Sequence, residues 1–413
     1  MKRHDFDEPT ARRGTGCVKW DEAYPSSTFY TSTLTPAQAA EANPGDFIPM
    51  WVADMDFAVA PAIQAAILRR AQHPVFGYTH VGSDYYDAII SWFSRRHQWA
   101  IKREEILYTT GVVPAMSAAI KALTMPGEKV LILSPDYNCF FSSIRNNGCE
   151  VLESPLTPRP TSTGQHRFEI DWEDFECKCA DAKTTVFLLC SPHNPTGRVW
   201  TAEELLRLND ICLRHGVKVV SDEIHCELEM PGHKYTPLAS VDPRFEEITI
   251  TLTSPTKSFN IAGIHISNMV SANPEIRARV DKVINIWEHC DVNQFGVTAL
   301  TAAYSVRGAE WLRALNAYLW DNYLALKDLL VRELPDYTVM DLEGTYLVWV
   351  DCGACKVPTT TVQEELIKTE KVWVNSGEIY GDKRYMRINI ACPRGLLMEG
   401  LGRFVKGIKR LSK

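Results

Sequence analysis

Between residues 106 and 252 the sequence alternates short apolar runs with longer stretches of helical periodicity. Segments with an apolar residue every three or four positions separate the apolar runs, as at 202–215. Parallel strands need such helical crossovers, and both faces of their sheet are then covered. The sequence therefore predicts an α/β fold with a mostly parallel sheet sandwiched by helices. The runs that have the length and composition of buried strands are 106–108, 129–134, 150–153, 185–190, 218–221 and 248–252.

Polar residues stand directly after four of the predicted strands. They are the turn at 109–114, Asn194, Asp222 and Lys257. In an open parallel sheet, ligands bind beyond the carboxyl ends of the strands, so we expect these elements to share one site. The turn leads into a predicted helix, whose first N–H groups and dipole favour a phosphate.

Lys257 lies in a setting that is unusual for a lysine, the segment Ser-Pro-Thr-Lys-Ser-Phe-Asn-Ile-Ala-Gly at 254–263. Burial among apolar residues disfavours the ammonium and lowers its pKa, which makes the amine a nucleophile able to form a Schiff base. The hydroxyls of Ser254 and Thr256 are placed to hold a phosphate nearby. A lysine in a surface loop is the alternative interpretation.

One cofactor would use all four elements. Pyridoxal 5'-phosphate (PLP) needs a lysine for its aldehyde, a carboxylate for its ring nitrogen and a donor for its phenolic oxygen. Lys257, Asp222 and Asn194 supply these groups. Each residue also has an ordinary interpretation, because an aspartate can cap a following helix and Asn-Pro-Thr-Gly is a strong turn signal. The agreement of all four elements favours the cofactor.

The composition excludes several other functions. The net charge of −7 provides no basic face for nucleic acid, and no run approaches the length of a membrane span. The N-terminus has no apolar core of a signal peptide, and the twelve cysteines are scattered through apolar segments. We therefore expect a cytoplasmic protein with reduced thiols. Cys352 and Cys355 have Cys-x-x-Cys spacing, but no second pair stands near them, so no metal site is predicted.

The length of 413 residues suggests two domains. Residues 1–50, with a short helix expected at 35–42, are predicted to form an N-terminal arm and part of the small domain. Residues 51–290 are predicted to form the large cofactor-binding domain. A strand-like run at 48–57 spans the start of this domain. Residues 291–413 are predicted to form a small α+β domain. Its expected elements are strands at 346–350 and 384–391 and helices at 361–370 and 394–411.

Several segments resemble fold-type I PLP enzymes of the class I/II aminotransferase superfamily. These are Ser-Pro-His-Asn-Pro-Thr-Gly at 191–197, Ser-Asp-Glu-Ile-His at 221–225 and the lysine segment at 254–263. Other segments resemble the cystathionine β-lyase (C–S lyase) branch of the MalY/PatB type, and the resemblance covers nearly the whole chain. The segments that carry this narrower resemblance are Lys19-Trp20-Asp21, Trp-Val-Ala-Asp-Met-Asp-Phe at 51–57, Thr-Tyr-Leu-Val-Trp at 345–349 and Met-Arg-Ile-Asn-Ile-Ala-Cys-Pro-Arg at 386–394, and the run at 51–57 points to this branch.

The resemblance implies a role for each matching residue around the cofactor. Lys257 attaches PLP and later acts as the base, Asp222 pairs with the ring nitrogen, and Tyr137 stacks on the ring; these three are the implied catalytic residues. Asn194 bonds the phenolic oxygen. Tyr78 reaches the phosphate of the neighbouring subunit, which implies a homodimer. The remaining implied cofactor contacts are Gly111, Val112, Val113, His225, Ser254 and Thr256.

The resemblance also implies how the substrate is held. Arg387 carries a guanidinium that suits a planar carboxylate and is implied to bind the substrate α-carboxylate. Tyr346 is the second residue expected to contact the substrate. Two features depart from the aminotransferase pattern. His225 replaces a tyrosine, as is usual for the lyase branch, and the run after Gly263, which often supplies an arginine to the phosphate, is Ile264-His265-Ile266. Phosphate binding then depends on hydroxyls, amides and Tyr78.

The implied reaction is β-elimination from cystathionine or a related cysteine S-conjugate. Lys257 removes the Cα proton, a thiolate leaves from Cβ, and the products are a thiol, pyruvate and ammonia. An aminotransferase would share every cofactor residue and is the first alternative. A lyase with an additional regulatory protein-binding role is the second, although nothing in the sequence marks a partner surface.

Overall fold

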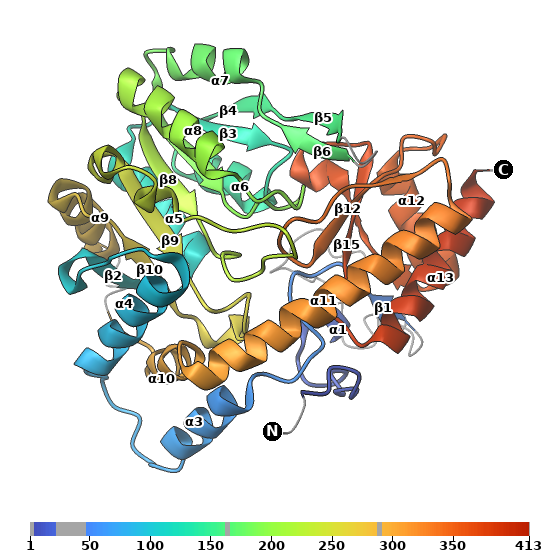
Figure 1. The fold of residues 1–413 in the computed structure, drawn as a ribbon, viewed down its shortest axis with the longest axis horizontal. Helices are drawn as coiled ribbons and strands as arrows, with labels where there is room; N and C mark the ends of the chain where they lie inside the picture. Colours follow the sequence, from blue (N-terminus) through green and yellow to red (C-terminus); the bar gives the residue numbers. More distant parts are fainter. Residues whose placement is uncertain (1–3, 22–46, 162–165, 287–290, 413) are drawn as a thin grey trace. The chain divides into compact units, whose positions relative to one another are not determined.

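The computed structural model describes residues 4–21, 47–161, 166–286 and 291–412 (Figure 1). The helix expected at 35–42 lies outside these residues. The chain divides into two compact units. The central unit comprises Val59–Ala317 and Asp341–Thr345, and the terminal unit comprises Met1–Ala58, Tyr318–Met340 and Tyr346–Lys413. These units do not coincide with the expected domain limits at 50/51 and 290/291, which stay a prediction.

A seven-stranded sheet forms the middle of the central unit, with the strand order β2-β10-β9-β8-β7-β3-β4. Every pair is parallel except those made by β10, which runs antiparallel to both β2 and β9. The predicted α/β fold with a mostly parallel sheet is confirmed. The strands are β2 Ile106–Thr109, β3 Lys129–Ser134, β4 Glu150–Pro155, β7 Thr184–Cys190, β8 Lys218–Asp222, β9 Thr249–Thr253 and β10 Ser267–Val270.

Helices cover both faces of this sheet because alternate strand residues point to opposite sides. Val186 and Leu188 of β7 join the apolar core under α5, α6 and α9, whereas Phe187 meets Phe175 of α7 at 4.9 Å on the other face, where α8 also lies (Figure 1). The covering helices are α5 Val112–Leu123, α6 Asn138–Asn146, α7 Trp172–Cys179, α8 Ala202–His215 and α9 Pro274–Ile286.

Local signals set the limits of α8. Thr201 and Glu204 form a capping box at its start, and Gly216 adopts a left-handed conformation after its end. Between these caps Leu205, Leu208 and Ile211 are buried on one side of the helix. Burying each such side chain contributes roughly 1.5–3 kcal/mol, so the apolar stripe fixes α8 on the sheet.

Other elements of the central unit lie outside the main sheet. β5 Thr157–Pro160 and β6 His166–Glu169 form an antiparallel pair. The remaining helices of this unit are α3 Pro61–Ala71, α4 Ser83–His97, η1 Arg103–Glu105, η2 Leu238–Ser240, η3 Pro243–Glu247, η4 Ala262–Ile264 and α10 Gln294–Ala303; α11 Val306–Glu333 contributes to both units.

The terminal unit contains a four-stranded antiparallel sheet with the order β11-β12-β15-β14 and a parallel pair, β1 and β13. Its strands are β1 Ile48–Pro49, β11 Thr338–Val339, β12 Leu347–Asp351, β13 Val372–Trp373, β14 Asn375–Ser376 and β15 Tyr385–Asn389. Its helices are α1 Val18–Asp21, α12 Thr359–Glu365, η5 Leu366–Glu370, η6 Gly377–Tyr380 and α13 Arg394–Leu411.

The strand-like run predicted at 48–57 is wrong beyond its first two residues. Only Ile48 and Pro49 pair as a strand, and the chain then runs irregularly past Trp51. The physical reason is that the carbonyls of residues 51–54 accept hydrogen bonds from polar side chains instead of from the backbone of a neighbouring strand. Among the residues described, no helix has the length and apolarity needed to cross a membrane.

Candidate active site

The strand register brings the predicted polar elements to one edge of the central sheet. Cys190 at the end of β7 aligns with Asp222 at the end of β8, and Asp222 aligns with Leu252 near the end of β9. Because β2 and β9 are both antiparallel to β10, β2 ends at the same edge. The loops after five strands therefore meet there, and they carry Gly111, Tyr137, Asn194, Asp222 and Lys257.

Asp222 is a buried acid, 3% exposed, whose carboxylate accepts a hydrogen bond from the Ile224 amide at 3.1 Å. The pKa of Asp222 is raised to about 7, chiefly by burial and also by nearby Asp136 and Glu223, whereas the Ile224 amide and the charge of Lys257 act to lower it. Lys257 is thus close enough to act on the Asp222 carboxyl. A cationic ring beside Asp222 would lower the pKa of the Asp222 carboxyl and keep this carboxyl ionised.

Lys257 is half-buried in the loop that follows β9, between Thr256 and Ser258, which are both buried. The hydroxyl of Ser254 donates to the Ile266 carbonyl at 2.6 Å and accepts from the Thr256 amide at 3.1 Å. Ser254 therefore shapes the loop that presents Lys257. Its predicted contact with a phosphate stays a prediction and requires the hydroxyl to turn from Ile266.

The N-terminus of α5 is ready to bind an anion. Gly111 is its N-cap residue and provides no side chain to bond the first turn, which contains Val112 and Val113. The first N–H groups of a helix have no partner within the helix, and its dipole favours negative charge. This end of α5 therefore fits the phosphate site predicted from the sequence.

Tyr137 precedes α6 at the same edge. Burial raises the pKa of the neighbouring Cys139 thiol, whereas a hydrogen bond with Tyr137 and the charge of Lys257 lower it. Tyr137 and Cys139 therefore lie near Lys257. Sequence analysis missed Cys139, and no pattern distinguished it from a core cysteine.

Asp136 and His193 form a second feature that sequence analysis missed. Both are fully buried, with His193 Nε2 3.8 Å from Asp136 Oδ2 and His193 Nδ1 2.7 Å from the Thr196 hydroxyl. Burial raises the pKa of Asp136. Asn194 follows His193 directly and is also buried, as is His225 after β8.

Tyr78 does not pack into its own chain. It follows α3, and 95% of its surface is exposed. The predicted role of Tyr78 at a neighbouring subunit is consistent with this exposure and stays a prediction.

Arg387 and Tyr346 belong to the terminal unit. Arg387 Nη2 donates to the Trp51 carbonyl at 2.8 Å, and its guanidinium lies over the Tyr380 ring at 4.6 Å. The hydroxyl of Tyr346 donates to the Ala53 carbonyl at 2.9 Å. Tyr346 is completely buried, and its predicted substrate contact stays a prediction.

Comparison with known proteins places this geometry in a family. The sequence model of the protein family aminotransferase class I and II matches residues 46–404. The chain belongs to this family. Cystathionine beta-lyase PatB of Bacillus subtilis (strain 168) is 38% identical over 401 residues, 97% of this chain and 98% of the relative. Protein MalY of Escherichia coli (strain K12) is 33% identical over 412 residues, 98% and 99% of the two chains.

A solved structure agrees with the family. The crystal structure of cystalysin from Treponema denticola, which contains a pyridoxal 5'-phosphate cofactor, has a TM-score of 0.90 and 33% identity, covering 99% of each chain. The resemblance found in the sequence is confirmed. In this aminotransferase-family chain, the buried Asp222, the adjacent Lys257 and the uncapped start of α5 fit the ring nitrogen, aldehyde and phosphate of PLP.

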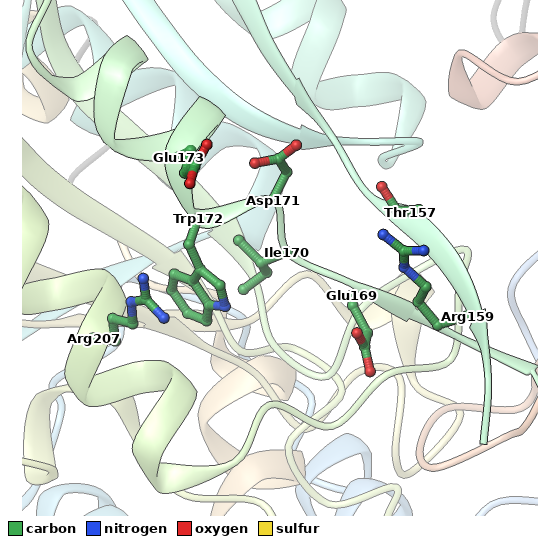
Figure 2. A pocket seen from close by; sticks show the side chains of 8 residues that line it. All are labelled: Thr157, Arg159, Glu169, Ile170, Asp171, Trp172, Glu173 and Arg207. Carbon is green, nitrogen blue, oxygen red and sulfur yellow. The ribbon is translucent and has the colours of Figure 1, made fainter. Parts of the chain in front are cut away.

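Two further features do not belong to this site. A surface pocket of about 370 Å³ lies beside the β5–β6 pair, where the Arg207 guanidinium stacks on the Trp172 ring at 4.3 Å (Figure 2). None of the predicted site residues lines it. Cys352 and Cys355 are free thiols, and the described residues contain no group of three or more His, Cys, Asp or Glu arranged to hold a metal.

Proposed function

We propose that the protein is a PLP-dependent carbon–sulfur β-lyase that cleaves cystathionine or a related cysteine S-conjugate to a thiol, pyruvate and ammonia. The observation that carries this proposal is the buried Asp222 under the electrostatic influence of Lys257 at one sheet edge. The similarity to a cystathionine beta-lyase over 97% of the chain supports this reaction in particular.

The residues of the chain have distinct tasks in this reaction. PLP, when bound, supplies an electron sink for the negative charge that develops at the substrate Cα. Lys257 removes the Cα proton as the base, and an ionised Asp222 would hold the ring nitrogen of PLP. Arg387 binds the α-carboxylate of the substrate and so limits how the substrate can turn. Asn194 and the start of α5 hold the phenolic oxygen and the phosphate.

Purified protein incubated with PLP and L-cystathionine is expected to release pyruvate and homocysteine in equal amounts. Pyruvate is measured with lactate dehydrogenase and the thiol with a chromogenic disulfide. An aminotransferase would instead consume an added keto acid and form no pyruvate from cystathionine. Amino transfer that depends on the keto acid, without release of thiol, would contradict the proposed elimination.

We also propose a homodimer, which the exposed surface near Tyr78 supports. Tyr78 is 95% exposed, and its neighbours Leu68, Val75 and Phe76 are 58–61% exposed. Large apolar side chains that are exposed on one segment favour an interaction site there. The proposed occupant is a second copy of the chain, whose phosphate site receives the Tyr78 hydroxyl. A cytoplasmic location stays a prediction from the sequence.

Tyr78→Phe is expected to leave the dimer intact and to weaken PLP binding by about tenfold or more, because it removes one hydrogen bond to a charged group. Sedimentation equilibrium is expected to give twice the 46.6 kDa of the chain. PLP affinity is measured by fluorescence titration. Tyr86→Phe is the matched control, since Tyr86 is a half-buried tyrosine of α4. A monomer, or unchanged PLP affinity, would exclude this role of Tyr78.

A further inference from the structure

The segments that resemble the lyase branch meet at one loop of the terminal unit, Trp51–Asp56, here called the 51–56 loop. Polar side chains from β15, and from Tyr346 just before β12, donate hydrogen bonds to its carbonyls. Tyr346 donates to Ala53, Arg387 donates to Trp51, and Asn389 donates to both Val52 and Asp54. The four distances are 2.9, 2.8, 2.5 and 2.7 Å in that order. The irregular loop thus acquires its shape from side chains.

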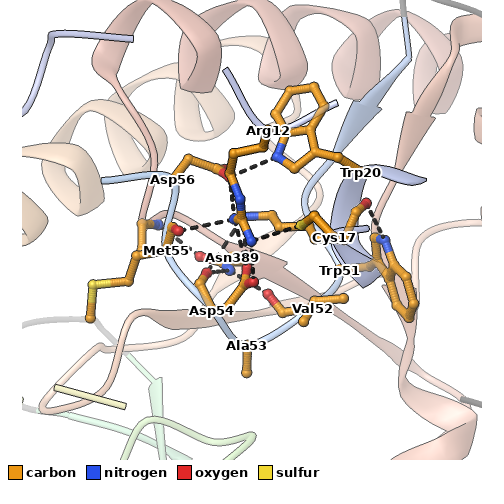
Figure 3. Close-up of polar contacts among 12 residues, drawn as sticks. Arg12, Cys17, Trp20, Trp51, Val52, Ala53, Asp54, Met55, Asp56 and Asn389 are labelled. Atoms are coloured by element: carbon orange, nitrogen blue, oxygen red, sulfur yellow. Dashed lines mark hydrogen bonds and ion pairs between the residues drawn. The ribbon is translucent and has the colours of Figure 1, made fainter. Parts of the chain in front are cut away.

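The side chains of the same loop bind the N-terminal arm (Figure 3). The Arg12 guanidinium forms a fork to Asp54, with distances of 3.2 and 2.5 Å, and also reaches Asp56 Oδ1 at 2.6 Å. Lys19 Nζ lies 2.7 Å from Asp56 Oδ2, and Trp20 Nε1 donates to Asp56 Oδ1 at 2.8 Å. The Lys-Trp-Asp segment and the 51–57 segment therefore bind each other.

The charges of this network balance. Arg12 and Lys19 oppose Asp54 and Asp56, and the side chains of Lys19 and Asp56 are only 1% and 4% exposed. Although burial alone would lower the pKa of Lys19, Asp56 and Asp54 raise it. A buried charge without its partner is strongly unfavourable, so the arm and the loop are stable only when they are together.

We propose that the N-terminal arm positions Arg387 for the substrate carboxylate, with Arg12 as a positioning residue that acts through the 51–56 loop. Arg12 fixes the carboxylates of Asp54 and Asp56, and these fix the 51–56 loop. The Trp51 carbonyl at the start of this loop then orients the Arg387 guanidinium. Arg387 sets the preference of the enzyme for substrates with an α-carboxylate, and Arg12 maintains that preference. This inference rests on the proposed lyase function and on the carboxylate role of Arg387.

The test compares S-ethyl-L-cysteine with S-ethylcysteamine, which has the same amine and thioether but no carboxylate. Release of ethanethiol gives kcat/KM for each, and their ratio measures recognition of the carboxylate. Arg387→Met is expected to lower this ratio about 30-fold or more, since it removes one partner of a hydrogen-bonded charge pair. Arg12→Met is expected to lower it about tenfold, mostly through KM, because a small displacement of a positioned group is costly.

Further variants separate a displaced Arg387 guanidinium from a loss of folding or of cofactor binding. A loss of folding or of cofactor would lower both rates equally and leave the ratio unchanged. Arg12→Lys, which keeps the charge, is expected to restore part of the ratio, and Arg12→Met/Arg387→Met is expected to match Arg387→Met alone. Glu8→Gln is the control, because Glu8 is an exposed charge of the same arm.

Hydrogen exchange of the protein without PLP gives a second readout. Peptides that cover residues 50–57 are expected to exchange faster in Arg12→Met than in wild type, and Glu8→Gln is expected to leave them unchanged. If Arg387→Met lowers the ratio but Arg12→Met changes neither ratio nor exchange, the positioning role is overturned and the lyase proposal stands. If wild type releases no ethanethiol from S-ethyl-L-cysteine, the proposed function itself fails.

Discussion

Lys257→Ala is expected to lower the rate of pyruvate release from L-cystathionine by about 10³–10⁴-fold, because a positioned general base contributes up to about this factor. Lys257 lies in a loop shaped by Ser254 and close enough to affect the pKa of Asp222. No neighbouring residue can replace an amine at that position. The variant is assayed for pyruvate at saturating PLP, so that weak cofactor binding does not account for the loss.

Two comparisons make this prediction specific. Lys121→Ala, which removes an exposed lysine from α5 in the same unit, is expected to retain full activity. A small primary amine added to Lys257→Ala is expected to restore part of the rate, since the missing group is a base. Activity within tenfold of wild type in Lys257→Ala would mean that the reaction takes place elsewhere.

Most of the fold could be predicted from the sequence because its signals are local. The helix at 202–215 was expected with its observed limits, and the structure shows that Thr201, Glu204 and Gly216 cap those ends through contacts within a few residues. The run at 48–57 shows where local signals fail. Its apolar residues favour a strand, but hydrogen bonds from residues about 300 positions away, such as Arg387, fix an irregular loop.

The residues of the candidate site also fall into those that local sequence signals reveal and those that they do not. Asp222 and Lys257 could be placed at one sheet edge because each follows a strand, and the register then brings them together. Asp136 and Arg12 could not be found, since their importance depends on partners distant in sequence. His193 lies 57 residues from Asp136, and Asp54 lies 42 residues from Arg12. No periodicity in one sequence encodes such pairs.

Asp222→Asn is expected to lower the rate of pyruvate release by about 10²–10³-fold and, at the same time, to stabilise the protein without PLP. The loss of rate follows because a neutral amide cannot stabilise a cationic ring nitrogen as a carboxylate does. The side chain remains similar in shape, and its oxygen can still accept from the Ile224 amide. The effect on activity is therefore electrostatic, and it can be separated from any effect on folding.

The gain in stability follows from the sign of the pKa shift. Burial raises the pKa of Asp222 to about 7, above the value of about 3.9 in an unfolded chain. The folded protein therefore binds more protons between these two values, and its free energy of unfolding falls as the pH rises through this range. Replacing Asp222 by asparagine removes this fall in the free energy of unfolding. Glu223, whose pKa burial also raises to about 7, is present in both proteins and cancels in the comparison.

Chemical denaturation at several pH values tests this sign. Without PLP, Asp222→Asn is expected to exceed wild type by a few kcal/mol at pH 8, since one pKa unit corresponds to about 1.4 kcal/mol, and to equal it near pH 4. Asp281→Asn, an exposed residue of α9, is expected to show no such difference. With PLP added at pH 8 the order is expected to reverse, because only the carboxylate gains a cationic partner. A variant that is less stable at pH 8 in both conditions would show that Asp222 is structural.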